Sequence, residues 1–425
     1  MADTIFALSS GAAPAAIGVI RISGARAGDA LRSLAGSLPP PRRASYRSLV
    51  DADGQVLDRA FVLWLPGPGT ATGEDLAELH CHGGRAVIAA IEAALAHVPG
   101  VRRAQPGEFT RRAFANGKID LAEAEGLADL LFAETELQRR SALAMAGGEF
   151  SRQVERWRAG VLEASAMVEA VLDFADEDDV TALPVDFVLS LADLREDIAA
   201  WLTRPRAETL REGLRVVLAG PPNAGKSTLF NALVEAEAAI TAPVAGTTRD
   251  VLTRPVAIEG IPFLFIDTAG LRDDADDRIE VIGVERARQQ VDGADLVLWL
   301  GGEGQGPEQG WEIDAQVDRP GHCAKSIARH RLSAVTGEGL GALRDDLVNF
   351  ARKALPRAGE AALSERQRRL LAEAEAMLSG AQQLSDPLLV AEHLRLARLA
   401  FDSLVGRATT EDMLDTLFGR FCIGK

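Results

Sequence analysis

The chain has 425 residues, which is too long for a single hydrophobic core, so two or three domains are expected. Hydrophobic residues make up 47% and charged residues 25%, as in ordinary soluble globular proteins. The net charge of -16 argues against a protein that coats nucleic acid through bulk electrostatics, but it leaves room for a local basic patch or a basic partner.

The cysteine content and the N-terminus indicate a compartment. Cys81, Cys323 and Cys422 are too few and too scattered for a disulfide framework, which fits a reducing environment. The first residues lack a basic region followed by a continuous apolar core, so no signal peptide is predicted. No run approaches the roughly 18 apolar residues of a membrane span. We therefore expect a cytoplasmic protein.

Residues 1–118 mix short strands with one clear helix. The segments IGVIRIS and AFVLWLP predict strands, and GRAVIAAIEAALAHV predicts a helix with an apolar stripe. This is an α+β pattern. In ELHCHGG, His80 and His82 share one face of a strand. These two histidines and the thiol of Cys81 are too close together for good chelation, and a fourth ligand is not evident, so packing and hydrogen bonding are favoured over a metal site.

Charged residues in this first region have plain structural interpretations. Arg21 and Glu78 each interrupt an apolar strand, and taken alone they indicate a buried ion pair. The arginine pairs Arg111-Arg112 and Arg139-Arg140 are interpreted as solvated charges, although a nucleic-acid footprint could begin there.

Residues 119–210 predict an all-α segment. A helix begins after Asp120, with Glu123 completing a capping box, and the helical pattern continues to about Phe150. Two further helices follow, separated by the acidic run Asp176–Asp179. That run is interpreted as a solvated connector, with a metal site as the weaker alternative.

Residues 211–355 alternate strand and helix, as in a parallel α/β domain, and residues 356–425 return to helix. The last segment contains a helix that starts at Asp386-Pro387 and a short one from Glu411. Helices on both sides of an α/β segment predict one helical domain interrupted by an inserted domain.

The segment GPPNAGKS is the most specific motif in the chain. It follows an apolar strand and precedes a helix, which is the context of a P-loop. The loop N–H groups and the helix N-terminus would hold phosphates, Lys226 would reach the β- and γ-phosphates, and the hydroxyl of Ser227 would bind Mg²⁺.

Further segments favour a guanine nucleotide over ATP. GTTRD would supply Thr248 to Mg²⁺, and FLFIDTAG would place Asp267 beside the metal and the Gly270 N–H beside the γ-phosphate. RLSAVTGEG would supply the loop behind the base. From these motifs, and for residues 242–245 from the family resemblance given below, the residues expected to contact GTP are Asn223, Ala224, Gly225, Lys226, Ser227, Thr228, Ala242, Pro243, Val244, Ala245, Gly246, Thr247, Thr248, Asp267, Thr268, Ala269, Gly270, Asp318, Ser333, Ala334 and Val335.

The position after Asp-Thr-Ala-Gly holds Leu271, where many GTPases have a glutamine that orients water. Hydrolysis then needs another device. Asn223 and Thr247 suggest a monovalent cation beside the phosphates, and a carboxylate in RIEVIGVERA could position the water. Asn223 could equally be a loop residue that tolerates an unusual backbone conformation.

Base recognition departs from the usual pattern. No Asn-Lys-x-Asp sequence is present, and Ala315-Gln316-Val317-Asp318 keeps only the aspartate. The preceding GGEGQGPEQG is short and Gly-rich, where a helix would be usual. Weakened base discrimination is expected, unless another contact compensates.

With these motifs in place, the chain resembles the MnmE (TrmE) family of bacterial tRNA-modification GTPases over essentially its whole length. The resemblance rests on IGVIRISG, GEDLAELHCHGG, PGEFTRRAFANGKIDLAEAEGLADLL, GPPNAGKSTLFNAL, AGTTRD, DTAGLR and the terminal FCIGK. It implies a multidomain α+β and α/β protein with an N-terminal folate-binding domain that dimerises (1–118), a helical domain in two parts (119–210 and 356–425), and an inserted Ras-like G domain (211–355).

The resemblance also implies an activity and its partners. It implies a homodimer that joins the FAD-dependent partner MnmG in a heterotetramer or larger complex. The complex adds an aminomethyl or carboxymethylaminomethyl group to C5 of the wobble uridine of certain tRNAs, with a 5-formyl-tetrahydrofolate type of one-carbon unit. GTP hydrolysis would depend on Mg²⁺, on K⁺ and on pairing of the G domains.

Site residues carry over from the family position by position. Asn223 and Thr247 match K⁺ ligands by side chain, and Ala242 and Val244 match backbone ligands. Ser227 and Thr248 match Mg²⁺ ligands, and Glu280 matches the hydrolytic glutamate, with a spacer one residue longer than usual after Asp267. Arg21, Glu78, Lys118 and Lys425 match folate contacts, and Cys422 matches a terminal cysteine with a proposed catalytic role.

One alternative function stays open on the sequence. A regulatory or ribosome-assembly GTPase would act as a binding switch without covalent chemistry. The folate-like segment and the terminal cysteine favour tRNA modification, since a pure switch needs neither.

Overall fold

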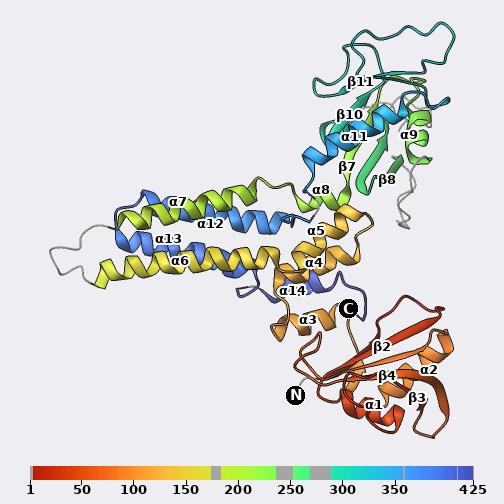
Figure 1. Cartoon of the computed structure of the whole chain (residues 1–425), viewed down its shortest axis with the longest axis vertical. Coiled ribbons are helices and arrows are strands. Elements are labelled where there is room, and N and C mark those ends of the chain that lie inside the picture. Colours follow the sequence, from red (N-terminus) through yellow and green to blue (C-terminus); the bar gives the residue numbers. More distant parts are fainter. Residues whose placement is uncertain are drawn as a thin grey trace, which may run out of the picture. The chain divides into compact units, whose positions relative to one another are not determined.

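The computed structural model describes residues 3–173, 183–235, 252–268, 289–357, 359–408 and 410–424 (Figure 1). The chain divides into two compact units, one made of residues 1–128 with 402–425 and the other of residues 129–401. None of the helices in the described ranges is long and apolar enough to cross a membrane.

The first unit is built on a six-stranded sheet in the order β3-β4-β5-β2-β1-β6. Neighbouring strands are antiparallel except β1 and β6, which are parallel. The strands are β1 (Thr4–Leu8), β2 (Ile17–Ser23), β3 (Ser45–Val50), β4 (Val56–Leu65), β5 (Leu76–His82) and β6 (Val101–Arg103).

Alternation along β2 determines which face of this sheet is buried. Ile20 and Ile22 are fully buried and share a core with residues of α1 (Ala27–Ala35) and α2 (Arg85–Ala96). Because successive side chains alternate between faces, Arg21 lies on the opposite face. The two helices therefore cover the face that carries Ile20 and Ile22, and the opposite face, which carries Arg21, makes other contacts.

Three more helices contribute to this unit, and they come from both the N-terminal and the C-terminal part of the chain. They are α3 (Glu108–Ala115), the first part of α4 (Leu121–Leu131) and α14 (Glu411–Phe418). The capping box predicted at Asp120 and Glu123 is confirmed, because each backbone N–H donates to the other residue's carboxylate at 2.8 Å. Leu121 of α4 packs in one apolar cluster with Phe418 and Phe421.

The sequence prediction of one helix from Asp120 to about Phe150 is wrong. Helix α4 ends at Leu131, and a new helix, α5 (Glu136–Ala146), begins after Thr135. Thr135 and Gln138 form a second capping box, which satisfies the N–H groups of a helix start and so favours a break there.

The second unit contains a bundle of long helices and a second sheet. The helices are α6 (Glu149–Asp173), α7 (Val185–Leu202), α12 (Glu365–Gln383) and α13 (Pro387–Leu404), and they lie side by side (Figure 1). Trp157 of α6 is at their centre, with Trp201 edge-on and Phe401 stacked, both at 5.9 Å between ring centroids. The acidic run Asp176–Asp179 lies outside the described residues.

The second sheet has the order β12-β11-β10-β7-β9-β8. All its neighbours are parallel except β8 and β9, as expected for an α/β domain. Its elements are α8 (Ala207–Glu212), β7 (Leu214–Ala219), α9 (Lys226–Glu235), β8 (Leu252–Ile258), β9 (Ile261–Asp267), β10 (Leu296–Trp299), β11 (Trp311–Ala315), β12 (His330–Leu332) and α11 (Leu340–Ala354). The Gly-rich connection between β10 and β11 contains no helix, as predicted.

Candidate functional site

The P-loop connects β7 to α9, as the sequence predicts. Its conformation needs the residues that are present: Gly220 and Gly225 have φ of +149° and +91°, and Asn223 has φ of +62°. A Cβ on Gly220 would lie 3.0 Å from the backbone nitrogen of Gly301. The tight loop therefore brings a row of backbone groups to the N-terminus of α9, the arrangement that binds phosphates.

Lys226 is held over this loop. The residue is 6% exposed, and Nζ donates to the carbonyl oxygens of Gly220 at 2.9 Å and Pro221 at 2.8 Å. A buried ammonium needs such partners, because an unpaired charge in a protein interior is costly. Its charge thus lies where the loop would receive phosphates.

Ser227 and Asp267 meet at the carboxyl ends of neighbouring strands. Leu218 of β7 pairs with Asp267 of β9, so the end of β9 lies beside the P-loop. The Ser227 hydroxyl donates to Asp267 Oδ2 at 2.6 Å, and Thr268 Oγ1 donates to the Leu218 carbonyl at 2.9 Å. A hydroxyl and a carboxylate are oxygen ligands of the kind that Mg²⁺ prefers, so these two residues fit that ion.

The residues expected around the base also come together. A small pocket of about 50 Å³ lies beside the P-loop and α9. Its lining residues are Gly225, Thr228, Leu229, Ala315, Gln316, Asp318, Arg319, Leu332, Ala334 and Val335. Asp318 is exposed, and a hydrogen bond from the buried Ser333 holds the pKa of its carboxyl below its usual value. Asp318 is therefore an ionised acceptor at neutral pH.

Gln316 makes a contact that sequence reasoning missed. Its Nε2 donates to the carbonyl oxygen of Asn223 in the P-loop at 3.1 Å. In the sequence, only the departure from Asn-Lys-x-Asp pointed to this position. The departure shows that the usual Asn and Lys side chains are missing, but it does not show which contact replaces them.

Several predicted site residues lie outside the described residues. They are Ala242, Pro243, Val244, Ala245, Gly246, Thr247, Thr248, Ala269, Gly270, Glu280 and Lys425.

In the first unit, Arg21 and Glu78 face each other across β2 and β5. Arg21 Nε and Nη2 donate to Glu78 Oε1 at 3.2 and 3.1 Å. His80 Nε2 lies 3.1 Å from the other carboxylate oxygen of Glu78, so both oxygens of this group have partners. The predicted ion pair is present but only partly buried, with 27% of the Arg21 and 18% of the Glu78 side chain exposed, and the hydrogen-bonding role of His80 is confirmed. His82 likewise bonds Asp58 at 2.8 Å.

Lys118 follows α3 and is exposed, with its stem against Gly73. A Cβ at Gly73 would lie 3.0 Å from Lys118 Cε, so glycine leaves the space that the lysine occupies. The Asn116 amide donates to the Thr72 carbonyl at 2.7 Å, which holds the same loop against the end of α3.

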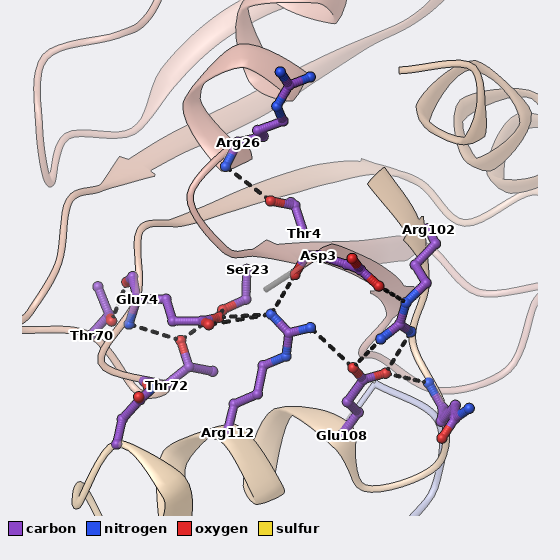
Figure 2. A network of polar contacts seen from close by, with 12 residues as sticks. Asp3, Thr4, Ser23, Arg26, Thr70, Thr72, Glu74, Arg102, Glu108 and Arg112 are labelled. Atoms are coloured by element: carbon purple, nitrogen blue, oxygen red, sulfur yellow. Dashed lines mark hydrogen bonds and ion pairs between the residues drawn. The ribbon is translucent and has the colours of Figure 1, made fainter. Parts of the chain in front are cut away.

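A polar network fixes α3 on the sheet (Figure 2). Arg112 donates to Glu74 at 3.2 Å, to Glu108 at 3.0 Å and to the Asp3 carbonyl at 2.7 Å. Ser23 of β2 donates to the same Glu74 at 2.7 Å. The prediction of a solvated charge is therefore wrong for Arg112, whereas Arg111, Arg139 and Arg140 are exposed or partly exposed and pair with carboxylates.

The C-terminal segment packs on the first unit. Phe421 is buried, Ile423 forms a bridge with Pro106, and Gly424 is buried with φ of +95°. A Cβ on Gly424 would lie 2.2 Å from the carbonyl oxygen of Leu8. Cys422 between them is exposed and is not in a disulfide. The segment is thus a docked part of the fold that presents a free thiol.

Comparisons with known proteins cover nearly all of the chain. The family model described as the MnmE helical domain matches residues 121–422, and the model described as the GTP-binding protein TrmE N-terminus matches residues 4–118. The tRNA modification GTPase MnmE of Erythrobacter litoralis is 63% identical over 100% of both chains. The protein of the same name from Novosphingobium aromaticivorans is 64% identical, again over 100% of both chains. That of Zymomonas mobilis is 49% identical over 99% of this chain and 100% of its own.

Proposed function

Because the chain belongs to the MnmE family of tRNA modification GTPases, we propose that it couples GTP hydrolysis to modification of C5 of the wobble uridine in tRNA. The observation that carries the GTPase part is the Ser227–Asp267 hydrogen bond beside a complete P-loop. A hydroxyl and a carboxylate bonded to each other beside this loop support a metal site next to the phosphates.

The proposed site residues divide the work on the nucleotide. The P-loop N–H groups and Lys226 would bind the phosphates, and Ser227, Thr248 and Asp267 would hold Mg²⁺, which would neutralise charge on the phosphate oxygens. Asp318 accepts from the N–H groups of guanine. In-line attack on the γ-phosphate then needs a residue that positions the attacking water. We assign this role to Glu280, because the side chain of Leu271 cannot hydrogen-bond the water.

A monovalent cation would supply the positive charge that other GTPases take from an arginine finger. We assign Asn223 to this role because its side-chain amide carries an oxygen ligand within the P-loop. Its φ of +62° by itself fits the alternative of a loop residue that tolerates an unusual backbone conformation. Thr247 and the carbonyls of Ala242 and Val244 would complete the K⁺ site. Hydrolysis should be faster in K⁺ than in Na⁺ at equal ionic strength, and equal rates would remove the cation from the mechanism. A loss of turnover in Glu280→Ala with unchanged nucleotide affinity would support the role of Glu280.

The first unit would bind a folate of the 5-formyl-tetrahydrofolate type. Arg21, Glu78, Lys118 and Lys425 form the proposed site, with the thiol of Cys422 available for a covalent step. The docking of Ile423 and Gly424 on Pro106 and Leu8 supports a tail that ends at this unit.

A homodimer would form through this unit. The rings of Tyr46 and Phe61 are in tilted contact, with 5.4 Å between ring centroids, and both residues are more than half exposed. Phe61 pairs with His80 across the strands, so these rings share the face of Arg21 and Glu78. Exposed aromatic side chains on a sheet face are typical of an interaction surface.

The decisive experiment analyses tRNA nucleosides from a deletion strain. Wild-type chain should restore the modified wobble uridine, and Lys226→Ala should not. Unmodified tRNA in the wild-type complemented strain would contradict the proposal and favour a GTPase switch without covalent chemistry. An assay with the purified FAD-dependent partner, folate and GTP, comparing wild type with Cys422→Ser, tests the thiol.

A further inference from the structure

The segment after β11 has an unusual backbone conformation at Gln316. Its φ is +64°, in the left-handed region that non-glycine residues enter at a cost. Asn223, the residue it contacts in the P-loop, also has a positive φ of +62°. Two strained residues are therefore joined by one hydrogen bond, and such strain persists only where the surroundings favour it.

The left-handed conformation directs the Gln316 side chain to the phosphate loop. Nε2 donates to the Asn223 carbonyl at 3.1 Å. The same atom lies 2.9 Å from the point where a Cβ on Gly225 would sit. The glutamine amide thus occupies the space that this glycine leaves open.

The segment that carries Gln316 and Asp318 is held from its other side as well. Asp314 is 2% exposed and accepts from His322 Nε2 at 2.8 Å and from the Lys325 N–H at 3.3 Å. The Arg319 N–H donates to the Gln316 carbonyl at 3.0 Å. These bonds order the segment internally, and the Gln316 amide connects it to the P-loop.

We propose that Gln316 is a positioning residue of the guanine-nucleotide site, which ties the base-binding segment to the phosphate-binding loop. The proposal rests on the proposed GTP binding and extends it. Gln316 sets the spacing between the base-binding segment and the P-loop. Asp318 alone recognises the base, by accepting hydrogen bonds from the N–H groups of guanine. Ala315 has only a methyl group there, so it adds no hydrogen bond.

This division of roles predicts two different losses. Loss of the Gln316 donor should weaken the binding of every purine nucleotide by the same factor, because the hydrogen bond from Gln316 to the P-loop does not involve the base. Loss of the Asp318 carboxylate should instead reduce the preference for guanine over hypoxanthine, which lacks the 2-amino group.

The test compares Gln316→Glu, Gln316→Ala and Gln316→Lys in the full chain, with fluorescent GDP and IDP as probes. Glutamate has the same size but cannot donate when ionised, and lysine keeps a donor of similar reach. We expect the Glu and Ala variants to bind both nucleotides about 3- to 10-fold more weakly, as for one lost hydrogen bond, with the GDP/IDP ratio unchanged. The Lys variant should recover most of the affinity. Asp318→Ala should lower the GDP/IDP ratio.

Three results would contradict the proposed role of Gln316 in tying the base-binding segment to the P-loop. They are wild-type affinity in Gln316→Glu, a changed GDP/IDP ratio in that variant, or equal losses in all three variants with unchanged circular dichroism. Failure of the wild-type chain to bind either nucleotide would instead contradict the proposed GTPase function, so the two failures are distinguishable.

Discussion

Arg111 and Arg112 are neighbours on α3 with different surroundings. The Arg112 side chain is 13% exposed and touches two carboxylates, Glu74 and Glu108, that are themselves largely buried. The Arg111 side chain is 39% exposed, and its partners are on the surface of α14. Removing Arg112 would take a cationic partner from two largely buried carboxylates, of which Glu108 would keep Arg102, whereas removing Arg111 would affect only exposed carboxylates.

Arg112→Met should therefore lower the free energy of unfolding of the first unit by about 2 to 3 kcal/mol. Arg111→Met, the matched control, should cost less than about 1 kcal/mol, as for other exposed ion pairs. Hydrogen exchange of the β1, β2 and β5 amides in the full chain measures the difference. Equal protection in the two variants would mean that the network adds no stability.

Glu108 makes the same network dependent on pH. Burial raises the pKa of Glu108, but hydrogen bonds from Arg102, from the Gln105 N–H and from Arg112 outweigh it and bring the pKa to about 2, from an ordinary 4.5. The folded state thus favours the charged form. Its contribution to stability is complete above about pH 4.5 and is lost as the pH falls toward 2.

Glu108→Gln should consequently destabilise the first unit at pH 7 and have little effect near pH 2. The difference between wild type and variant should shrink steadily between pH 4.5 and 2. Hydrogen exchange, or denaturant unfolding where the chain stays soluble, follows this difference. A gap that stays constant over this range would assign the effect to packing instead of charge.

At the scale of residues, the sequence predicted the site through local patterns. The P-loop, Lys226 and Ser227 follow from a short motif, and Asp318 from its place after a strand. Gln316 could not be predicted, because its contact depends on a backbone φ that no local pattern specifies. Arg112 was misjudged because its partner Glu74 comes from a loop that is distant in sequence.

At the scale of elements, capping residues decided where helices start. Asp120 with Glu123 was recognised, and α4 begins there. Thr135 with Gln138 has the same spacing but lies inside an unbroken helical pattern, so the periodicity hid the break. Periodicity shows which segments are helical more reliably than it shows where one helix ends and the next begins.

The tail after α14 depends on a single glycine. Gly424 combines a positive φ with a Cβ position only 2.2 Å from the Leu8 carbonyl, so any side chain would force the backbone apart. Gly424→Ala should release the tail while leaving the rest of the first unit folded. Exchange at the Phe421 and Ile423 amides should accelerate at least about tenfold, which corresponds to about 1.4 kcal/mol of lost docking.

Gly36→Ala is the control for this change. Gly36 also has a positive φ, of +76°, but nothing lies within 4 Å of its Cβ position. It reproduces the backbone strain without the clash, so the tail amides should exchange as in wild type. Unchanged exchange at Phe421 in Gly424→Ala would show that the tail is held by other contacts.

At the scale of the whole molecule, the sequence predicted the type of secondary structure in each segment better than it predicted which segments pack into one compact unit. An α+β segment, long helices and a parallel α/β segment all appear. The grouping of residues 402–425 with 1–128 was not predicted, since the apolar contact between Phe418 and Leu121 joins segments at opposite ends of the chain. The boundaries at 118, 210 and 355 stay predictions.

Charge over the whole chain bears on how tRNA is bound. The net charge is -16, and the exposed arginines that could begin a footprint are already paired. Arg139 and Arg140 both bond Glu136, and Arg111 bonds Glu411 and Asp415. Phosphate binding would have to displace these carboxylates and overcome the overall repulsion.

The chain alone should therefore bind tRNA weakly, with a dissociation constant of about 10 μM or weaker near physiological salt, as for non-specific contacts. Addition of the proposed FAD-dependent partner should tighten binding at least about tenfold if that partner supplies the positive surface. Fluorescence anisotropy of labelled tRNA, at several salt concentrations, measures both quantities. The double variant Arg139→Gln, Arg140→Gln should bind as weakly as wild type. Submicromolar binding by the chain alone, lost in that double variant, would place a tRNA surface at the start of α5 and reverse this assignment of roles.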